Sequence, residues 1–110
     1  MQLAIQPINF YLGTLKRQNG VATATLQITL SCGCPTCAGG RFDPERFNVV
    51  ARLFKKDTCK GEFKCVYSGQ ASQFVCHFPD VEPGRYHLEI EGSDPDSGAA
   101  GRLCMAVEVI

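Results

Sequence analysis

The sequence carries no excess of charge, because eleven basic side chains balance eleven acidic ones and no block of basic residues occurs. A nucleic-acid binder needs a positively charged surface against the phosphates, so no nucleic-acid partner is expected. Long apolar runs are also missing, which excludes a membrane-spanning helix. With 110 residues, 45% of them hydrophobic, the chain is predicted to fold as a single domain over residues 1–110.

Residue patterns that would indicate an enzyme are absent as well. The sequence has no Ser-His-Asp spacing, no phosphate-binding loop and no pair of catalytic carboxylates. We therefore expect no enzymatic activity. The first residues, 1–5, lack the basic region and apolar core of a signal peptide. Either the protein reaches its place without such a peptide, or a leader was removed and Met1 was added for expression.

Dense turn signals predict an all-β protein. Pairs such as Asn19-Gly20 and Pro83-Gly84 recur at short spacing, and stretches of alternating apolar and polar residues lie between them. These alternating stretches are 22–30, 74–78, 86–91 and 103–109. The opening run, 3–12, is apolar enough to predict an edge strand that is interrupted at Pro7.

The segment 47–56 (FNVVARLFKK) fits two patterns. Alternate positions from Phe47 to Leu53 fit a strand, whereas Phe47, Val50 and Phe54 fit one face of a helix. Asp43-Pro44 before it is typical of a helix start. We favour the strand, because each neighbouring segment is predicted to be one.

The stretch 74–110 carries a more specific pattern. Residues 78–86 (FPDVEPGRY) precede an alternating segment, and 91–94 (EGSD) lead through Gly101 to a final strand. This stretch resembles the last three strands of an immunoglobulin-like or fibronectin-type-III-like module of the kind found on bacterial surfaces and phage particles. Pro-Gly-x-Tyr resembles the tyrosine corner, in which the phenol of Tyr86 would anchor the preceding loop. The resemblance implies an antiparallel β-sandwich of about seven strands.

Two departures exclude the antibody pattern within that family. Antibody domains have a cysteine two residues after the corner tyrosine, where this chain has Leu88, and they have a core tryptophan, of which this chain has none.

The chain is rich in cysteine. An odd number leaves at least one thiol unpaired or bonded to another chain. The seven, all of them disulfide candidates, are Cys32, Cys34, Cys37, Cys59, Cys65, Cys76 and Cys104. A strand of about ten residues spans roughly 33 Å, so a sandwich would separate them into two groups. We expect Cys59 and Cys65 at one end and the other five at the opposite end.

Residues 59–65 (CKGEFKC) suggest the tip of a hairpin with a cysteine on each arm. Residues opposite each other on paired strands are close enough for a disulfide. We therefore predict a Cys59–Cys65 bridge, with two free thiols as the alternative.

Cys34-Pro-Thr-Cys37 admits three interpretations. Disulfides that staple the loop are favoured. A zinc site is the second, with Cys34, Cys37, Cys32 and Cys104 as ligands, or with Cys76 or His77 completing it. Thiol redox chemistry is the third, although the βαβ context that it usually has is missing. No cofactor is expected unless zinc is bound.

Two further groups were considered as metal ligands. His77 and His87 fall at outward positions of strands expected to be adjacent, where they would share a metal or simply face solvent. Asp94, Asp96 and Ser97 would chelate calcium or form a solvated turn. We favour the surface histidines and the turn.

These features favour a non-catalytic structural or binding module, a subunit or accessory protein of a virion, filament or cell surface, stabilised by cysteine cross-links. The alternative is a small intracellular zinc-binding or thiol-redox protein that uses Cys34 and Cys37. The terminal segments 3–12 and 103–110 carry almost no charge, unlike most exposed sheet edges. We expect one of them to pack as an edge strand against a second copy or a larger protein partner.

Overall fold

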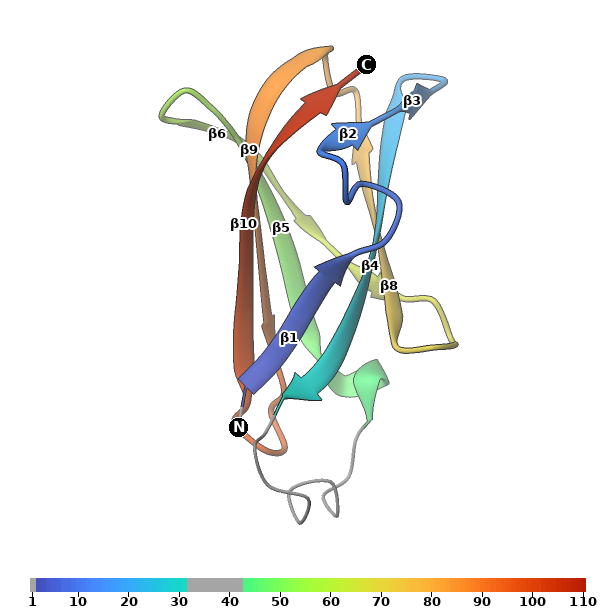
Figure 1. Ribbon diagram of the computed structural model, residues 1–110, viewed down its shortest axis with the longest axis vertical. Helices are drawn as coiled ribbons and strands as arrows, with labels where there is room; N and C mark the ends of the chain where they lie inside the picture. The colour runs from blue at the N-terminus through green and yellow to red at the C-terminus, as the bar shows by residue number, and fades with distance from the viewer. Residues whose placement is uncertain (1, 32–42) are drawn as a thin grey trace.

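Ten β-strands and one 3-10 helix make up residues 2–31 and 43–110, the part of the chain that the computed structural model describes (Figure 1). The elements are β1 (Gln2–Pro7), β2 (Thr14–Leu15), β3 (Arg17–Gln18), β4 (Val21–Ser31), η2 (Pro44–Arg46), β5 (Asn48–Lys55), β6 (Thr58–Lys64), β7 (Val66–Tyr67), β8 (Gln73–Pro79), β9 (Gly84–Ser93) and β10 (Ala100–Val109). The predicted all-β class is confirmed. The expected number of strands was lower because β2, β3 and β7, of two residues each, have no alternating pattern to reveal them.

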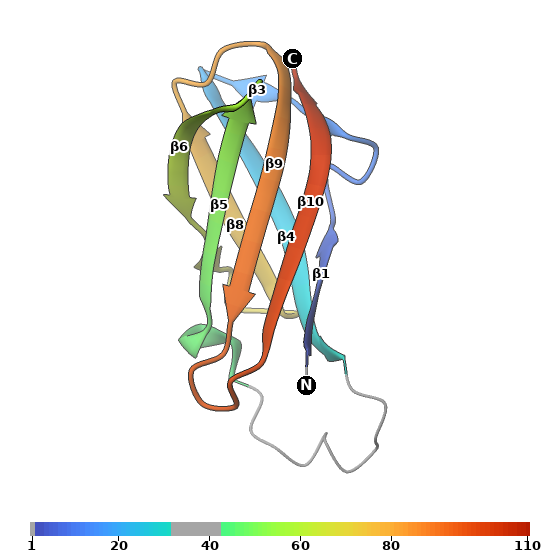
Figure 2. The same cartoon turned by 90° about the vertical axis from the view of Figure 1, so that its left-hand side faces the viewer.

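The strands form two layers that face each other across the core (Figure 2). Hydrogen-bonded neighbours follow the order β6-β5-β9-β10 in one layer and β1-β4-β8-β7 in the other. A short parallel contact between Gln2 and Ala100 joins the layers along one side. On the other side, Phe63 of β6 packs edge-to-face on Phe78 of β8, with ring centroids 4.9 Å apart. The sheet therefore curls back on itself almost to closure.

The alternating stretches predict the core correctly. In β4, Ala24, Leu26 and Ile28 are fully buried, while Thr25 and Gln27 between them are partly exposed. In β9, Leu88 and Ile90 are buried in the same way. Period-two burial on both layers places one apolar face of each against the other, which is the arrangement that removes the most apolar surface from water.

The segment 47–56 is a strand, as predicted. Val49, Ala51 and Leu53 of β5 are buried, and the strand pairs with β6 on one side and β9 on the other. The helix-start signal at Asp43-Pro44 produces only the single turn of η2. Pairing on both sides of β5 prevails over the local helical preference.

In the described part of the chain, neither terminal strand is an end of the strand order, in contrast to the expected edge strand, although β1 and β10 pair with each other at one residue pair only. Packing of a terminal strand against a second copy or a larger partner stays a prediction. β1 pairs along its whole length with β4 and touches β10 at Gln2, and β10 lies between β9 on one side and β1 and β2 on the other. Gly101 allows this closeness, because a Cβ there would overlap the carbonyl oxygen of Leu3. Leu3 and Ile5 of β1 and Val107 and Val109 of β10 are buried, so one face of each terminal strand belongs to the core. Within the described residues, the ends of the strand order are β6 and β7.

No helix in residues 2–31 and 43–110 is long and apolar enough to cross a membrane.

Candidate functional site

Three of the cysteines, Cys32, Cys34 and Cys37, lie outside the described residues. Zinc binding, stapling disulfides and redox chemistry at Cys34-Pro-Thr-Cys37 therefore stay predictions. Cys104 is described, and it is an exposed free thiol in β10, opposite Glu89. Within the described ranges, no group of three or more His, Cys, Asp or Glu side chains is placed to hold a metal.

The predicted hairpin tip between Cys59 and Cys65 is wrong. β6 is one continuous strand, and the chain turns before it, at Lys56, whose φ is 55°. Six residues along a strand span about 20 Å, whereas a disulfide needs Cα atoms within roughly 7 Å. Gly61 suggested a turn, but it lies in the strand beneath the ring of Phe63, where a Cβ would be 2.6 Å from Cζ. The two cysteines therefore cannot bridge in this fold.

The prediction that the cysteines form two groups at opposite ends of the molecule, with Cys65 and Cys76 in different groups, is also wrong. Cys65 lies with Cys76, which had been assigned to the opposite group, and both thiols are free and buried in the core. The Cys76 Sγ is 3.9 Å from the Phe63 carbonyl oxygen. A hydrogen bond with the Cys65 thiol, and then burial, raise the pKa of Cys76 far above its ordinary value. The error follows from the misplaced hairpin, because a continuous β6 carries Cys65 away from Cys59.

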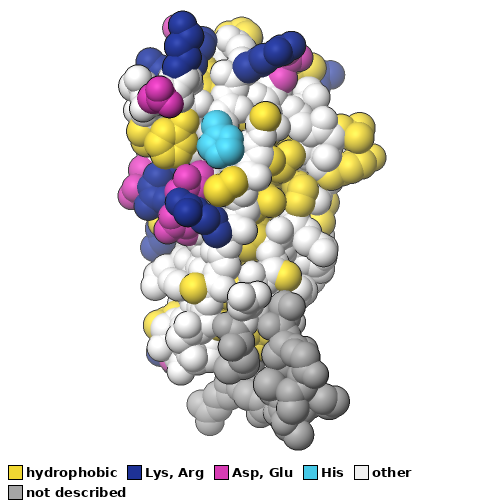
Figure 3. Space-filling model, turned by 60° about the vertical axis from the view of Figure 1, so that its left-hand side comes forward, with side chains coloured by type: hydrophobic (Ala, Val, Ile, Leu, Met, Phe, Trp, Pro, Cys, Tyr) yellow, Lys and Arg dark blue, Asp and Glu magenta, His cyan; other side chains and the backbone are white. Residues whose placement is uncertain are grey.

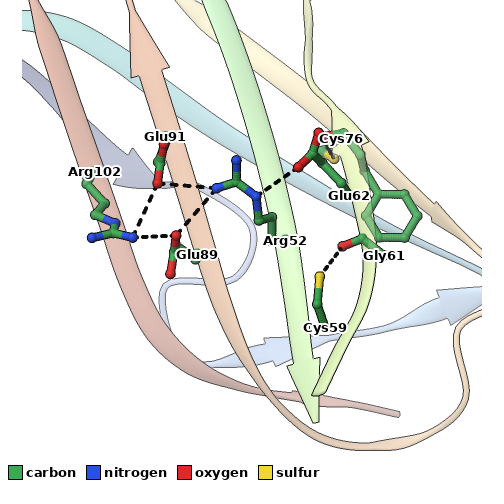
Figure 4. A network of polar contacts seen from close by, with 9 residues as sticks. Arg52, Cys59, Gly61, Glu62, Cys76, Glu89, Glu91 and Arg102 are labelled. Carbon is green, nitrogen blue, oxygen red and sulfur yellow. Dashed lines mark hydrogen bonds and ion pairs between the residues drawn. The ribbon is translucent and has the colours of Figure 1, made fainter. Parts of the chain in front are cut away.

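A ladder of charges crosses the outer face of the layer β6-β5-β9-β10 (Figures 3 and 4). Arg52 of β5 lies at its centre, with Nε 2.9 Å from Glu62 of β6 and Nη1 3.2 Å from Glu91 and 3.4 Å from Glu89 of β9. Arg102 of β10 closes the other side, with Nη2 2.5 Å from Glu89 and 3.2 Å from Glu91. This group is called the charge ladder below.

Hydrogen bonds within the charge ladder favour the charged forms of Arg52, Glu89 and Arg102. The hydrogen bond from Arg102 lowers the pKa of Glu89, and the hydrogen bond to Glu62 raises the pKa of Arg52. The pKa of Arg102 is raised chiefly by its hydrogen bond to Glu89. A carboxylate held in this way serves ion pairing and is a poor proton donor near neutral pH. These contacts link β6, β5, β9 and β10 across the outer face.

Sequence reasoning missed the charge ladder. The available signal was an acidic residue at every second position of one predicted strand, Glu89 and Glu91, with Arg52 and Arg102 in two other predicted strands. These charges come together only because the strands that carry them are paired, and the pairing of strands cannot be read from the sequence.

The loop between β9 and β10 is a closed turn. The carboxylate of Asp94, which is 2% exposed, accepts hydrogen bonds from the Asp96 amide at 3.0 Å and the Ser97 hydroxyl at 2.7 Å. The Ser97 hydroxyl lowers the pKa of Asp94 most, and burial opposes it. Arg46 of η2 pairs with Asp96 at 3.2 Å. Both Asp94 oxygens are thus engaged within the turn, which agrees with the turn interpretation except that Asp94 is buried rather than solvated.

The histidines do not share a site. His77 is in β8 and His87 is in β9, and these strands belong to different layers. The His77 Nδ1 is 3.1 Å from the Thr23 hydroxyl, and the His87 ring lies 6.5 Å from that of Phe54. The shared metal is excluded because the two strands are not neighbours.

Apolar side chains are exposed in the turn between β1 and β2. The Gly13 amide donates to the Phe10 carbonyl at 2.8 Å, which places Tyr11 and Leu12 at the corner of this turn. Phe10 is fully buried, whereas Tyr11 is 67% and Leu12 79% exposed. Together with Ile110, 52% exposed, they border a hollow of about 590 Å³. Tyr11, Leu12 and Ile110 are called the apolar corner below.

Comparison of the chain with protein-family models, with curated proteins and with solved structures found no match.

Proposed function

We propose that the chain is a non-catalytic immunoglobulin-like module that binds a different protein within a larger assembly, of the virion, filament or cell-surface type. The order of the strands supports the fold. In immunoglobulin domains one sheet has the order A-B-E-D and the other contains C, F and G, extended by C′ in the variable type. The layers β1-β4-β8-β7 and β6-β5-β9-β10 have the same order when β1 corresponds to A and β10 to G.

A second feature in favour of this fold is the loop before β9. The Tyr86 hydroxyl donates to the Glu82 carbonyl at 2.8 Å, four residues upstream. This is the contact that a tyrosine corner makes. Tyr86 is buried, with 7% of its surface exposed, so the hydrogen bond also satisfies a phenol that water does not reach.

The apolar corner carries the proposal of a binding function. Turn corners usually hold Gly, Pro, Asn or Asp, and a Tyr-Leu pair there exposes apolar surface to water at a cost. The hollow beside it is rimmed by polar side chains, and Lys16 is the one charged residue among those lining it. An apolar centre with a polar rim is the composition of a protein interface. The partner that fits presents an apolar side chain to Leu12 and a carboxylate to Lys16.

Site-specific photocrosslinking tests this proposal. Benzoylphenylalanine is placed at position 12, or at position 66 as a matched control, because Val66 is also apolar and 63% exposed but lies in β7. Irradiation of cells that make the protein is expected to give one discrete adduct from position 12 and none from position 66. Leu12→Asp is then expected to reduce recovery of that partner at least tenfold, while Val66→Asp leaves it unchanged.

Equal adducts from both positions, or none from position 12, would overturn the binding surface. A crosslinked dimer would make the partner a second copy and would overturn the choice of a different protein. Intact mass measured without reductant addresses the intracellular alternative directly, because bound zinc with reduced thiols at Cys34 and Cys37 would favour it over a cross-linked module.

A further inference from the structure

The chain passes from one layer to the other at Cys65. Lys64, the last residue of β6, is still paired with Val50 of β5, and the Cys65 amide donates to the Val49 carbonyl at 2.9 Å. The next residue, Val66, begins β7, which pairs with β8 in the opposite layer. The backbone at Cys65 is thus bonded to one layer while the following residues belong to the other.

Strand register places Cys76 directly opposite Cys65. Val66 pairs with Val75 and Tyr67 pairs with Phe74, so one further step backward aligns Cys65 with Cys76. The Ser68 amide donates to the Gln73 carbonyl at 2.8 Å, and hydrogen-bonded pairs alternate with non-hydrogen-bonded pairs along an antiparallel ladder.

Counting back from Ser68, the Cys65–Cys76 pair is a non-hydrogen-bonded one, which agrees with the Cys65 amide being bonded to β5. In such pairs the Cα atoms are about 4.5 Å apart and the side chains approach closely. Disulfides need Cα separations of roughly 4.4–6.8 Å. A disulfide can therefore form between these two residues without a shift of the backbone.

The surroundings of the two sulfurs favour the bridge as well. Cys65 is 3% exposed and Cys76 is fully buried, and the Cys76 thiol hydrogen-bonds with Cys65 and lies 3.9 Å from the Phe63 carbonyl. A disulfide replaces two weakly polar S–H groups in the core with an apolar link. It also connects the residue that follows β6 to β8, on the side of the curled sheet where Phe63 packs on Phe78.

We propose that Cys65 and Cys76 form a disulfide in the presence of a low-molecular-weight disulfide such as oxidised glutathione. The Cys65 thiolate attacks one glutathione sulfur, the glutathione disulfide breaks, and one glutathione thiolate leaves. The Cys76 thiolate then attacks the Cys65 sulfur and releases the second glutathione. Two protons and two electrons pass from the protein to the oxidant. The proposal does not depend on the apolar corner or its partner.

Because both thiols are buried, exchange requires β7 to open or takes place during folding. β7 has only two residues and lies at the end of the strand order, so opening it breaks few hydrogen bonds. We therefore expect slow oxidation of the folded protein and fast oxidation during refolding.

Two matched variants test the pair. In the first, only Cys65 and Cys76 are kept and the other five cysteines are replaced by Ser. In the second, only Cys59 and Cys65 are kept, with Cys76→Ala. Each is refolded from urea in a mixture of reduced and oxidised glutathione at low protein concentration. The first is expected to lose the mass of two hydrogens and to become resistant to alkylation. The second is expected to stay reduced or to carry glutathione.

Peptide mapping of the unmodified chain after the same refolding provides a check that does not depend on the folding of either variant. A peptide joining Cys65 to Cys76 is expected, together with a melting temperature that falls on the order of 10 °C when reductant is added. Alkylation of both Cys65 and Cys76 in the refolded chain, or a Cys59–Cys65 peptide, would overturn the proposal.

Discussion

Two side chains beside β9 hold its flanking loops by hydrogen bonds. Tyr86 reaches back to the Glu82 carbonyl, and Asp94 accepts from the turn that follows the strand. Both side chains are nearly buried. Loss of either hydrogen bond would therefore leave a polar atom in the interior without a partner, which costs free energy. These contacts fix where β9 begins and ends.

Tyr86→Phe removes the hydroxyl and leaves the Glu82 carbonyl without its donor. The free energy of unfolding is expected to fall by about 1 kcal/mol, as measured by urea denaturation. Tyr11→Phe is the control, because Tyr11 is 67% exposed and its hydroxyl can bond to water. Equal stability of Tyr86→Phe and the unmodified chain would show that the corner does not hold the loop.

Asp94 makes stability depend on pH in the acid range. Its pKa in the folded protein is lowered, chiefly by the Ser97 hydroxyl, so the ionised form binds better when the chain is folded. The resulting stabilisation is complete above the ordinary pKa of about 3.9 and is lost as pH falls through the lower folded value. Thermal melts between pH 6 and pH 2, roughly spanning this window, are expected to show a shallower decline for Asp94→Asn than for Asp57→Asn, a control at an exposed position. Parallel declines would contradict this assignment.

At the scale of elements, the alternation of apolar and polar residues does not determine which strands pair. The cross-strand pairs in the structure supply that information. Alternation states which side chains face the core, but it does not state which strands are neighbours. The core positions of β4, β5, β8 and β9 were therefore predicted correctly from the sequence. The interior position of β1, the path of β6 and the charge ladder were not, because each depends on pairing between segments far apart in the chain.

Two glycines show how a sequence pattern led to a wrong prediction. Gly61 was taken for a turn residue, but its missing Cβ makes room for the Phe63 ring. Gly101 was predicted to lie in the loop that leads to the last strand, but it lies in β10 and allows β1 and β10 to approach closely. Glycine marks both turns and close contacts, and the sequence alone does not distinguish the two.

The charge ladder is expected to stabilise the layer β6-β5-β9-β10 in a salt-dependent way. Arg52→Gln leaves Glu62, Glu89 and Glu91 facing one another across three strands, so the variant is expected to be less stable than the unmodified chain at low ionic strength. The difference should shrink in about 1 M salt, where the screening length is roughly 3 Å. Arg85→Gln is the control, because Arg85 is 90% exposed and pairs only with Glu108, at 3.6 Å. A deficit that salt does not change would mean that Arg52 acts through packing.

The packing of one face of β1 on the core is tested by substitutions on its two faces. Leu3→Ala and Ile5→Ala remove buried side chains and are expected to cost about 2–5 kcal/mol each. Gln2→Ala and Gln6→Ala, on the exposed face of the same strand, are expected to cost little. Similar losses from the two faces in urea unfolding would contradict the burial of Leu3 and Ile5 against the core.

At the scale of the whole molecule, the fold leaves few places for a partner to bind. β1 pairs fully with β4 and β10 pairs fully with β9, while among the described residues β1 and β10 pair with each other only at Gln2 and Ala100. The edge strand β6 carries lysines and a register shift near its start, where Gly61 and Cys59 pair with Leu53 and Phe54, and both features discourage pairing with another sheet. The charged side chains of the β6-β5-β9-β10 face largely neutralise one another. Among the exposed large apolar side chains of the described residues, three lie together in the apolar corner, whereas Val66 lies in β7.

Hydrogen exchange tests this account most directly. The chain is tagged, recovered with whatever binds it in the cells that make it, and compared with the isolated chain. We expect exchange to slow in the turn between β1 and β2 and at Ile110, with β1, β6 and the interior of β10 unchanged. Slowing centred on β6 or on the charge ladder, or no change at the β1–β2 turn in an intact assembly, would contradict the assignment of the apolar corner as the binding surface.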